Sequence, residues 1–226
     1  MDEDDGYTKS ADGRPSALET RMETEGRQFS PSVGRNRDAV AEAFGRVMPR
    51  VGSILEIGSG TGEHGIFLTE CFPEVRWFFS DRDDQARQSI SAWIRHSKRA
   101  GLEGPYAINA SLDRWGAEVE ALRFDGLFSA NVIHIAPFDV AEGIFSGAGR
   151  LLQSGGRLFL YGPFARAGEI AESNRNFDTD LKRRDIRWGV RDIERELVPL
   201  ADRHGLSLVT VIPMPKNNYS VIFEKG

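Results

Sequence analysis

The sequence predicts an α/β fold whose mostly parallel sheet is covered by helices on both faces. Three observations lead to this class. Short apolar runs alternate with segments in which apolar residues recur at helical spacing, which is the order of elements in βαβ units. A glycine-rich stretch, 58–65, directly follows the first of these runs. Asp81 ends the second run, and sheets of this class bind ligands where their parallel strands end.

The first half of the chain alternates helix and strand. A helix is predicted from Arg35 to Pro49, because Val40, Phe44 and Val47 recur at helical spacing and proline stops helices. The elements expected after it are a strand at 53–57, a helix at 66–72, a strand at 75–79, a helix at 86–100 and a short strand at 106–108. The run at 75–79, VRWFF, is rich in the β-branched and aromatic residues that strands prefer.

The second half continues this alternation and ends in a hairpin. The elements expected here are a strand at 124–130, a helix at 140–152, a strand at 157–161, a helix at 192–204 and strands at 206–212 and 219–223. The segment 164–191 is polar and long for a loop, so it is expected to be functional or to contain a further helix. The short link before the final strand predicts an antiparallel pair at the edge of the sheet.

Length and composition narrow the class of protein. The chain has 226 residues, 40% of them hydrophobic, which suits one packed domain, expected at 26–226. Residues 1–25 are polar and rich in acids without an apolar period, which predicts a mobile acidic tail and no secretory signal. No run of ~18 apolar residues occurs, so no membrane span is expected.

The net charge and the cysteine content indicate which partners and which cellular compartment to expect. The net charge is −5 and the pI about 5.5, which disfavours binding to the phosphate backbone of nucleic acids. The single cysteine, Cys71, excludes a disulfide within the chain and is typical of a cytoplasmic protein. Its apolar surroundings, LTECF, predict that it is a core residue.

The glycine-rich loop distinguishes two kinds of nucleotide ligand. A dinucleotide fingerprint, G-x-G-x-x-G, fails because its third glycine position, counted from Gly58, is Glu63. The spacing that is present is E-x-G-x-G-x-G, from Glu56 to Gly62. A carboxylate at Glu56 repels a pyrophosphate and attracts a cation, while Asp81 can accept hydrogen bonds from ribose hydroxyls. The two acids together favour S-adenosylmethionine. The alternative is a plain turn in which Asp81 only caps a helix.

With these motifs, the chain resembles class I S-adenosylmethionine-dependent methyltransferases, and more closely the DUF938 family, also called the methyltransferase-like 26 family. The stretches that carry the resemblance are SPSVGRNRD (30–38), LEIGSGTGEHGIFL (55–68), SDRD (80–83), SANVIHIAPF (129–138), FSGAGRLLQSGGRLFLYGPF (145–164), SNRNFD (173–178), RDIRWGVRD (184–192) and MPKNN (214–218). The resemblance implies a Rossmann-like, seven-stranded sheet in the order 3-2-1-4-5-7-6, with strand 7 antiparallel.

The resemblance also implies S-adenosyl-L-methionine as the cofactor and a site for it. The residues expected around the methionyl part and the ribose are Glu56, Gly58, Ser59, Gly60, Gly62 and Asp81. Where many relatives of this class hold an acid that meets the adenine amine, this chain has Asn109, followed closely by Ser111. An amide oxygen accepts the same hydrogen bond, so both residues are expected near the adenine. Asn131 is expected to bind the cofactor or to bridge to the substrate.

Transfer of a methyl group to a hydroxyl, thiol or ammonium needs a group that removes a proton. His134 is the candidate base, because it follows the strand at 124–130 on the ligand side; the alternative is a histidine that only packs behind the cofactor loop. His64 is expected to cover the cofactor. Arg35 and Asn36 lie in the segment 28–37, which in this architecture often folds over the cofactor; the alternative is a solvated start of a helix. Tyr161 ends the strand at 157–161 and points at the same mouth or into the core. The residues expected on the acceptor side are Arg35, Asn36, Tyr161, Asn174 and Asn217.

A cluster of arginines, 183–191, surrounds Trp188. Because aspartates are interleaved with them, the cluster is expected to be a solvated face, and a carboxylate-binding role for one arginine is the alternative. The acids of 81–84 lie at the ribose end, so no metal is expected.

The function predicted from these observations is methyl transfer from S-adenosylmethionine to a small molecule through an O, N or S atom. The alternative is a catalytically silent, cofactor-binding regulatory or scaffold protein. A nicotinamide oxidoreductase is disfavoured because no Tyr-x-x-x-Lys pair is present, and a protein substrate stays open. The chain also lacks the D/N/S-P-P-Y/F signature of enzymes that methylate amino groups of nucleic acids. A monomer or a homodimer is expected.

Overall fold

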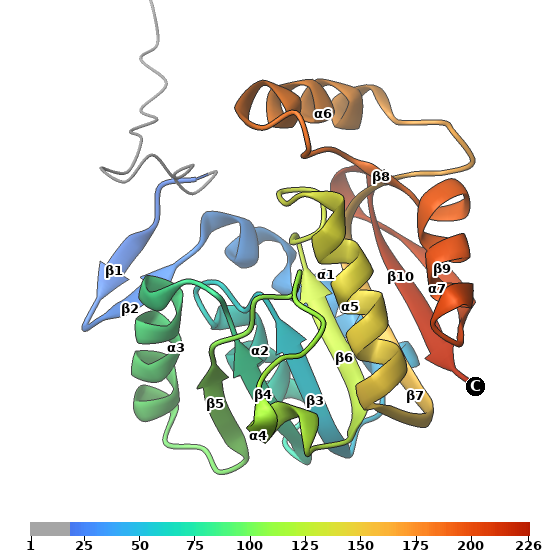
Figure 1. Ribbon diagram of the computed structural model, residues 1–226. Helices are drawn as coiled ribbons and strands as arrows, with labels where there is room; N and C mark the ends of the chain where they lie inside the picture. The colour runs from blue at the N-terminus through green and yellow to red at the C-terminus, as the bar shows by residue number, and fades with distance from the viewer. Residues whose placement is uncertain (1–18) are drawn as a thin grey trace, which may run out of the picture.

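The structure, a computed structural model, describes residues 19–226 and is built around one central sheet (Figure 1). Seven strands follow one another in the order β5-β4-β3-β6-β7-β10-β9. Numbered along the chain, this is the predicted order 3-2-1-4-5-7-6. The strands are β3 (Gly52–Ile57), β4 (Val75–Ser80), β5 (Leu102–Tyr106), β6 (Phe124–Ala130), β7 (Leu152–Ala165), β9 (Leu206–Met214) and β10 (Asn218–Lys225). An eighth strand, β8 (Arg191–Asp192), pairs with β7 outside this path.

The strand directions also agree with the prediction. β10 is antiparallel to both β7 and β9. The pairs β3–β4, β3–β6, β4–β5 and β6–β7 are all parallel. The carboxyl ends of β3, β4, β6 and β7 therefore lie along the same edge of the sheet, which is where ligands bind in this class of fold.

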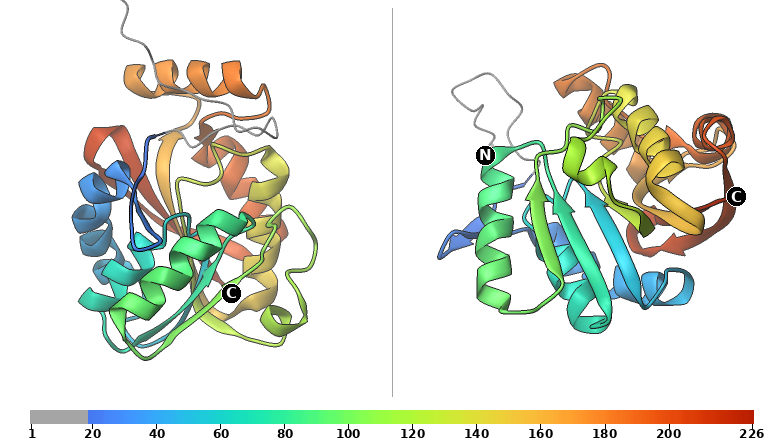
Figure 2. Two further views of the ribbon diagram at one scale, coloured as in Figure 1. Left: turned by 90° about the vertical axis from the view of Figure 1, so that its left-hand side faces the viewer. Right: turned by 60° about the horizontal axis from the view of Figure 1, so that its bottom comes forward.

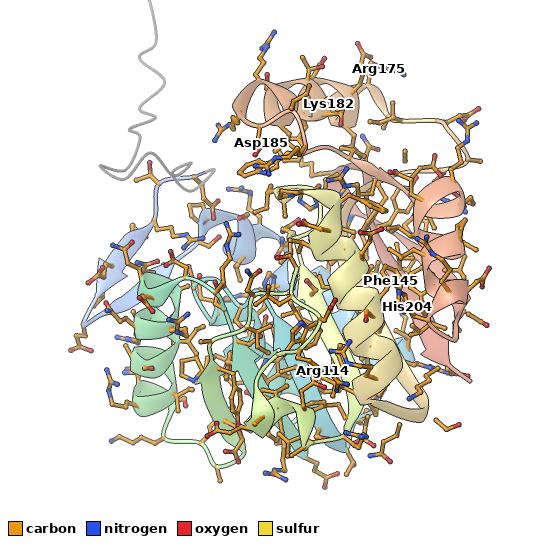
Figure 3. All side chains as sticks on the ribbon, viewed as in Figure 1. Arg114, Phe145, Arg175, Lys182, Asp185 and His204 are labelled. Carbon is orange, nitrogen blue, oxygen red and sulfur yellow. The ribbon has the colours of Figure 1, made fainter. Side chains whose placement is uncertain are left out.

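Helices cover both faces of the sheet (Figure 2). The helices on one face are α1 (Pro31–Val47), α2 (Glu63–Cys71) and α3 (Asp84–Ser97), and those on the other are α4 (Ala117–Glu120), α5 (Phe138–Leu151) and α7 (Val198–Arg203). Because side chains alternate along a strand, Ile54 belongs to the core under α1–α3 and Leu55 to the core under α5. Phe145 lies between α5 and the sheet, with its ring centre 5.0 Å from that of Phe223 (Figure 3).

A further helix, α6 (Glu172–Arg184), lies over the edge of the sheet where the parallel strands end (Figures 1 and 2). Only Asn174 and Leu181 of this helix are buried. Arg175 and Lys182 lie on α6, and Asp185 follows its end (Figure 3). The predicted segment 164–191 therefore contains a helix, and that helix covers a ligand edge rather than a core.

Several elements differ from the prediction. A short antiparallel hairpin, β1 (Met22–Thr24) with β2 (Arg27–Phe29), precedes α1. Of the tail expected at 1–25, residues 1–18 lie outside the described residues, and 22–24 form β1. The strand expected at 106–108 is β5, which ends at Tyr106. The helix expected at 192–204 begins as a π-helix, Ile193–Leu197, before α7.

The prediction that Cys71 is a core residue was wrong. Cys71 is exposed and is the last residue of α2. Within residues 19–226, no helix combines the length and the apolar character that crossing a membrane requires.

Candidate functional site

A cavity of about 920 Å³ opens at the carboxyl ends of the parallel strands. Its wall includes Gly58 after β3, Asp81 after β4, Asn131 after β6 and Pro163 near the end of β7. The strand order reverses between β3 and β6, so the cavity lies at the switch point of the sheet, the usual ligand position in this class.

The cavity brings together most of the residues that the sequence predicts for a site. The predicted residues that line it are Arg35, Asn36, Glu56, Gly58, Ser59, Gly60, His64, Asp81, Asn109, Asn131, His134, Tyr161 and Asn174. Gly62, Ser111 and Asn217 do not line it. Among residues 19–226, no group of three or more His, Cys, Asp or Glu side chains is placed to hold a metal ion.

The glycines of the loop serve different purposes. All three have left-handed backbones, with φ of +71° at Gly58, +57° at Gly60 and +92° at Gly62. A Cβ at Gly58 would lie 2.6 Å from Val132 Cγ2, and one at Gly62 would lie 3.2 Å from Ile90 Cγ1. A Cβ at Gly60 would meet only a side-chain nitrogen, 3.9 Å away. Packing against α3 therefore accounts for Gly62, which was predicted to contact the cofactor, whereas Gly60 exposes its backbone to the cavity.

Glu56 is a buried acid on the wall of the cavity. Its side chain projects from β3 and is only 2% exposed. Its Oε2 accepts a hydrogen bond from Trp77 Nε1 at 2.9 Å. Burial raises the pKa of Glu56 to about 7, although the hydrogen bonds from Trp77 and Ser59 oppose this shift. A cation bound beside this carboxyl would stabilise its charged form, so the site is suited to a positively charged ligand group.

Asp81 connects the glycine loop to the end of β4. Its Oδ2 accepts a hydrogen bond from the Gly60 N–H at 2.9 Å, and its Oδ1 accepts one from the Asp83 N–H at 2.9 Å. Burial raises the pKa of Asp81, against the effect of these two hydrogen bonds. Each carboxylate oxygen has a second lone pair. The side chain is therefore held in place and can still accept hydrogen bonds from ligand hydroxyls.

Asn109 and Ser111 form a local turn. Asn109 Oδ1 accepts hydrogen bonds from the Ser111 N–H at 3.2 Å and from the Ser111 hydroxyl at 2.9 Å. Because both lone pairs of this oxygen are used, Asn109 does not accept an adenine amine in the predicted way; its amide nitrogen is the group left to donate. Ser111, which was predicted to contact the cofactor, does not line the cavity, and its polar groups support Asn109.

A polar network joins four elements at the other end of the cavity. His64 Nε2 lies 2.9 Å from Asn36 Oδ1, and because that oxygen only accepts, the ring nitrogen is the donor. Asn218 Nδ2 donates to the Tyr161 hydroxyl at 3.2 Å. Burial raises the pKa of Tyr161, while hydrogen bonds from Asn36 and Asn218 lower it. The tyrosine oxygen thus receives two amide donors and has its own proton to offer to a ligand.

His134 lies on the same wall and is 2% exposed. Its ring packs edge-on against Phe177, with centres 5.9 Å apart. Its Nδ1 is buried and has no hydrogen-bond partner among the described residues. Burial, followed by the nearby Arg191 cation, lowers the pKa of His134 to about 3, so the ring is neutral at neutral pH. Nδ1 itself is enclosed by the protein, so Nε2 is the ring nitrogen that a ligand in the cavity can reach.

Arg191 supports the loop that carries His134. Its Nε donates to the Ile133 carbonyl at 3.1 Å. Its Nη2 donates to the Ala136 carbonyl at 2.7 Å and to the Arg187 carbonyl at 2.9 Å. Arg191 is the arginine of the predicted cluster whose guanidinium binds this loop, and it does so through backbone carbonyls.

Two other members of the arginine cluster pair with neighbouring acids. Arg183 pairs with Asp180 at 3.0 Å, and the side chain of Arg187 donates three hydrogen bonds to Asp185, the shortest at 2.6 Å. Their guanidinium groups are exposed, with relative side-chain exposures of 75% and 67%. These two arginines therefore behave as the solvated face that the sequence predicts.

Asn174 and Asn217 link α6 to the turn before β10. Asn174 Nδ2 donates to the Asn217 carbonyl at 2.8 Å, and Asn217 Nδ2 donates to the Ser173 hydroxyl at 2.9 Å. Asn217 was predicted to face the substrate. Its side chain instead binds α6, so its part is to fix the turn.

Several cavity residues were not predicted, among them Arg21, Phe177 and Lys216. Arg21 follows Glu19 in the segment taken as a tail, and its Nη1 donates to Gln28 Oε1 at 3.2 Å. Phe177 is the single aromatic residue of α6, a signal that could have identified it. Lys216 lies within the stretch MPKNN, which gave only the family resemblance.

Several solved structures with a similar fold are methyltransferases. An O-methyltransferase family protein from Burkholderia thailandensis superimposes with a TM-score of 0.71 at 14% identity, over 86% of this chain and 56% of its own. An O-methyltransferase family 2 protein from Planctomyces limnophilus, in complex with apigenin, gives 0.69 at 18%, over 86% and 60%. CalO1, a methyltransferase in calicheamicin biosynthesis in its SAH-bound form, gives 0.63 at 16%, over 87% and 61%.

These likenesses establish a shared Rossmann-like class I methyltransferase fold. The chain spans between about half and two thirds of the length of these three proteins. The family described as "Protein of unknown function (DUF938)" matches residues 27–225, which is nearly all of the described part of the chain. This chain therefore belongs to the DUF938 family.

Proposed function

We propose that this chain is an S-adenosylmethionine-dependent methyltransferase that acts on a small molecule. The observation that carries the proposal is one cavity with two chemically different ends. At one end, which we call the cofactor end, are Glu56, Gly60, Asp81 and Asn109. The other, the acceptor end, is formed by His134, Tyr161, Pro163, Asn174, Phe177, Pro215, Lys216 and Asn218.

The residues of the cofactor end fit the cofactor. The cavity volume, about 920 Å³, is near the top of the range of roughly 300–1,000 Å³ for small-molecule sites and leaves room for a second ligand. Open space over Gly60 lets a ligand approach the backbone. Glu56 would meet the cationic part and Asp81 the ribose hydroxyls. When bound, the cofactor supplies an electrophilic methyl group on a positively charged sulfur.

The chain's own residues would hold the acceptor, exclude water and accept a proton. α6 covers the acceptor end with Phe177 and Asn174. Tyr161 has a proton to donate to an acceptor atom, and the neutral His134 ring has a nitrogen that can accept one. The placement of the reacting groups supplies much of the rate in such transfers. The cytoplasmic location expected from the cysteine content stays a prediction.

Replacing His134 tests the proposed base. His134→Gln is expected to lower kcat by about a hundredfold or more, because glutamine occupies a similar volume but does not accept a proton. Binding of S-adenosylhomocysteine is expected to stay within about twofold of wild type. His96→Gln, an exposed position on α3, is the matched control. Unchanged turnover in His134→Gln would show that the ring only packs.

The glycine loop gives a second test, because substitutions at two of its glycines should affect different properties: Gly62 mainly the stability of the fold, and Gly60 mainly the binding of the cofactor. Gly62→Ala is expected to lower the free energy of unfolding by about 1–3 kcal/mol, since its Cβ meets Ile90 and its backbone is left-handed. Gly60→Ala costs only about 1 kcal/mol through the left-handed backbone. Its methyl group enters the cavity, so the affinity for S-adenosylhomocysteine should fall by about tenfold or more. Urea unfolding and calorimetry measure the two effects. Wild-type affinity in Gly60→Ala would contradict the assignment.

Transfer of label tests the activity itself. The protein is incubated with methyl-labelled S-adenosylmethionine and a cell extract separated into small-molecule and protein fractions. Label in the small-molecule fraction, lost in His134→Gln, is the expected result. Label in the protein fraction alone would replace the small molecule with a protein substrate. Tight cofactor binding without any transfer would favour the catalytically silent alternative.

A further inference from the structure

The turn between β9 and β10 presents a lysine to the acceptor end. Lys216 lies in the short turn Pro215–Asn217 and lines the cavity. Its backbone is left-handed, with φ +60° and ψ +37°, and Asn217 follows with φ +57°. A non-glycine residue in this conformation costs about 1–3 kcal/mol and persists where the surroundings fix it, often at ligand sites.

Hydrogen bonds fix this turn on two sides. Asn174 of α6 donates to the Asn217 carbonyl at 2.8 Å, and Asn217 donates back to Ser173 at 2.9 Å. On the other side, Asn218 donates to the Tyr161 hydroxyl and to the Pro215 carbonyl, both at 3.2 Å. The backbone of Lys216 is therefore held between the covering helix and the tyrosine of the acceptor end.

Among the described residues that line the acceptor end, Lys216 carries the one formal charge. The carboxylates that line the cavity are Glu19, Glu56 and Asp81, and all three lie outside the acceptor end. Within the part of the chain that the structure describes, the Lys216 ammonium forms no ion pair or hydrogen bond. Behind the cavity wall, Arg191 lies close enough to His134 to lower its pKa, and Glu196 and Asp178 lie near Arg191 in turn. This end therefore attracts an anion and repels an ammonium group.

Part of the wall of the acceptor end is apolar. Phe177 packs against the His134 ring, and Pro163 and Pro215 complete the same end. Flat apolar walls with a few placed polar groups are typical of sites for small aromatic or apolar ligands. A ligand body of this kind would bury its apolar surface here while a charged substituent reached the lysine.

We propose that the methyl acceptor is an aromatic or otherwise apolar carboxylic acid whose carboxylate pairs with Lys216, an inference that rests on the proposed function because it places the acceptor at this end of the cavity. Lys216 thereby determines specificity, by selecting acids over neutral and cationic molecules. A bound carboxylate would also oppose the effect of the Arg191 cation on His134 and raise the pKa of its ring, which would make the ring a better proton acceptor.

A matched set of probes tests the inference. The protein is saturated with S-adenosylhomocysteine and titrated calorimetrically with 4-hydroxybenzoate, 4-hydroxybenzamide and 4-hydroxybenzylamine. The acid is expected to bind about tenfold more tightly than the amide, and the amine least, as a charge-assisted hydrogen bond in a partly desolvated site predicts. Equal affinities, a preference for the amine, or no binding of the acid at roughly 10 mM would overturn the inference.

Variants of the lysine complete the test. Lys216→Met is expected to abolish the preference for the acid, and Lys216→Arg to restore most of it, with S-adenosylhomocysteine affinity unchanged in both. The matched control is Lys98→Met, since Lys98 is also an exposed lysine with a left-handed backbone, φ +54°, but lies outside the cavity. Persistence of the acid preference in Lys216→Met would overturn the inference.

The two proposals fail in distinguishable ways. Absence of S-adenosylhomocysteine binding removes the proposed function, whatever the probes do. Binding of S-adenosylhomocysteine without a Lys216-dependent preference for the acid removes only the assignment of the acceptor.

Discussion

Asp81→Asn is expected to weaken the binding of S-adenosylhomocysteine by about a hundredfold, or about 3 kcal/mol. In the wild type, one carboxylate oxygen accepts from the Gly60 N–H and the other from the Asp83 N–H, each at 2.9 Å. An asparagine has one acceptor oxygen, so its amide nitrogen would face one of these donors. The substitution therefore disturbs both the glycine loop and the carboxylate oxygens that would accept hydrogen bonds from the ribose.

Calorimetry on Asp81→Asn, with Asp84→Asn as the control, measures this effect. Asp84 lies three residues further on, is exposed and pairs with Arg87 outside the cavity. The control is expected to bind as the wild type does. If Asp81→Asn also bound as the wild type does, Asp81 would be a structural residue of the loop and not part of a nucleoside site.

Glu56→Gln is expected to stabilise the free protein at alkaline pH and to weaken cofactor binding. Burial raises the pKa of Glu56 from 4.5 to about 7. The folded protein therefore holds this proton more tightly than the unfolded chain does. The stabilisation is complete below pH 4.5 and is lost as the pH rises through about 7. Glutamine resembles the protonated acid at every pH and therefore does not lose this stabilisation. The free energy of unfolding of the variant should exceed that of the wild type by up to about 3 kcal/mol by pH 8.

The same carboxyl predicts a proton released on binding. A cationic ligand favours the charged form of Glu56, so binding of S-adenosylmethionine near pH 6.5 should release a fraction of a proton in the wild type and none through this group in Glu56→Gln. Calorimetry in two buffers that differ in protonation enthalpy measures the release. Glu70→Gln, on the exposed side of α2, is the control. A release that persisted in Glu56→Gln would assign it to another group.

The strands of the core could be predicted because their residues are buried on both faces. The aromatic run VRWFF became β4, and the alternation of strand and helix gave the class of fold. The order of the strands came from the family resemblance, not from the pattern. β5 was placed too late because Gly104 and Pro105 resemble a break; it is an edge strand, where proline is tolerated.

α6 could not be predicted from an apolar period, because it covers the mouth of a cavity and buries little. Its buried residues are Asn174 and Leu181, and the rest of the helix is polar or only partly covered. The hairpin β1–β2 gave no signal for the same reason, since none of its residues is buried.

The site could be predicted where residues follow strand ends directly, as Asp81, Asn131 and His134 do. Residues from distant segments, such as Arg21 and Lys216, reach the cavity only through the tertiary arrangement. Within the correct loops, spacing did not show which side chains turn toward the ligand. Gly62 packs on α3, Ser111 supports Asn109 and Asn217 binds α6, because neighbouring segments supply their contacts.

The central claim is that the cavity at the ends of β3 and β4 is a site for S-adenosylmethionine. Isothermal calorimetry of the purified protein with S-adenosylhomocysteine tests it most directly. The account predicts saturable binding at one site per chain, which Asp81→Asn weakens and Lys98→Met leaves unchanged. Absence of binding at millimolar ligand, or affinity unaffected by Asp81→Asn, would contradict it.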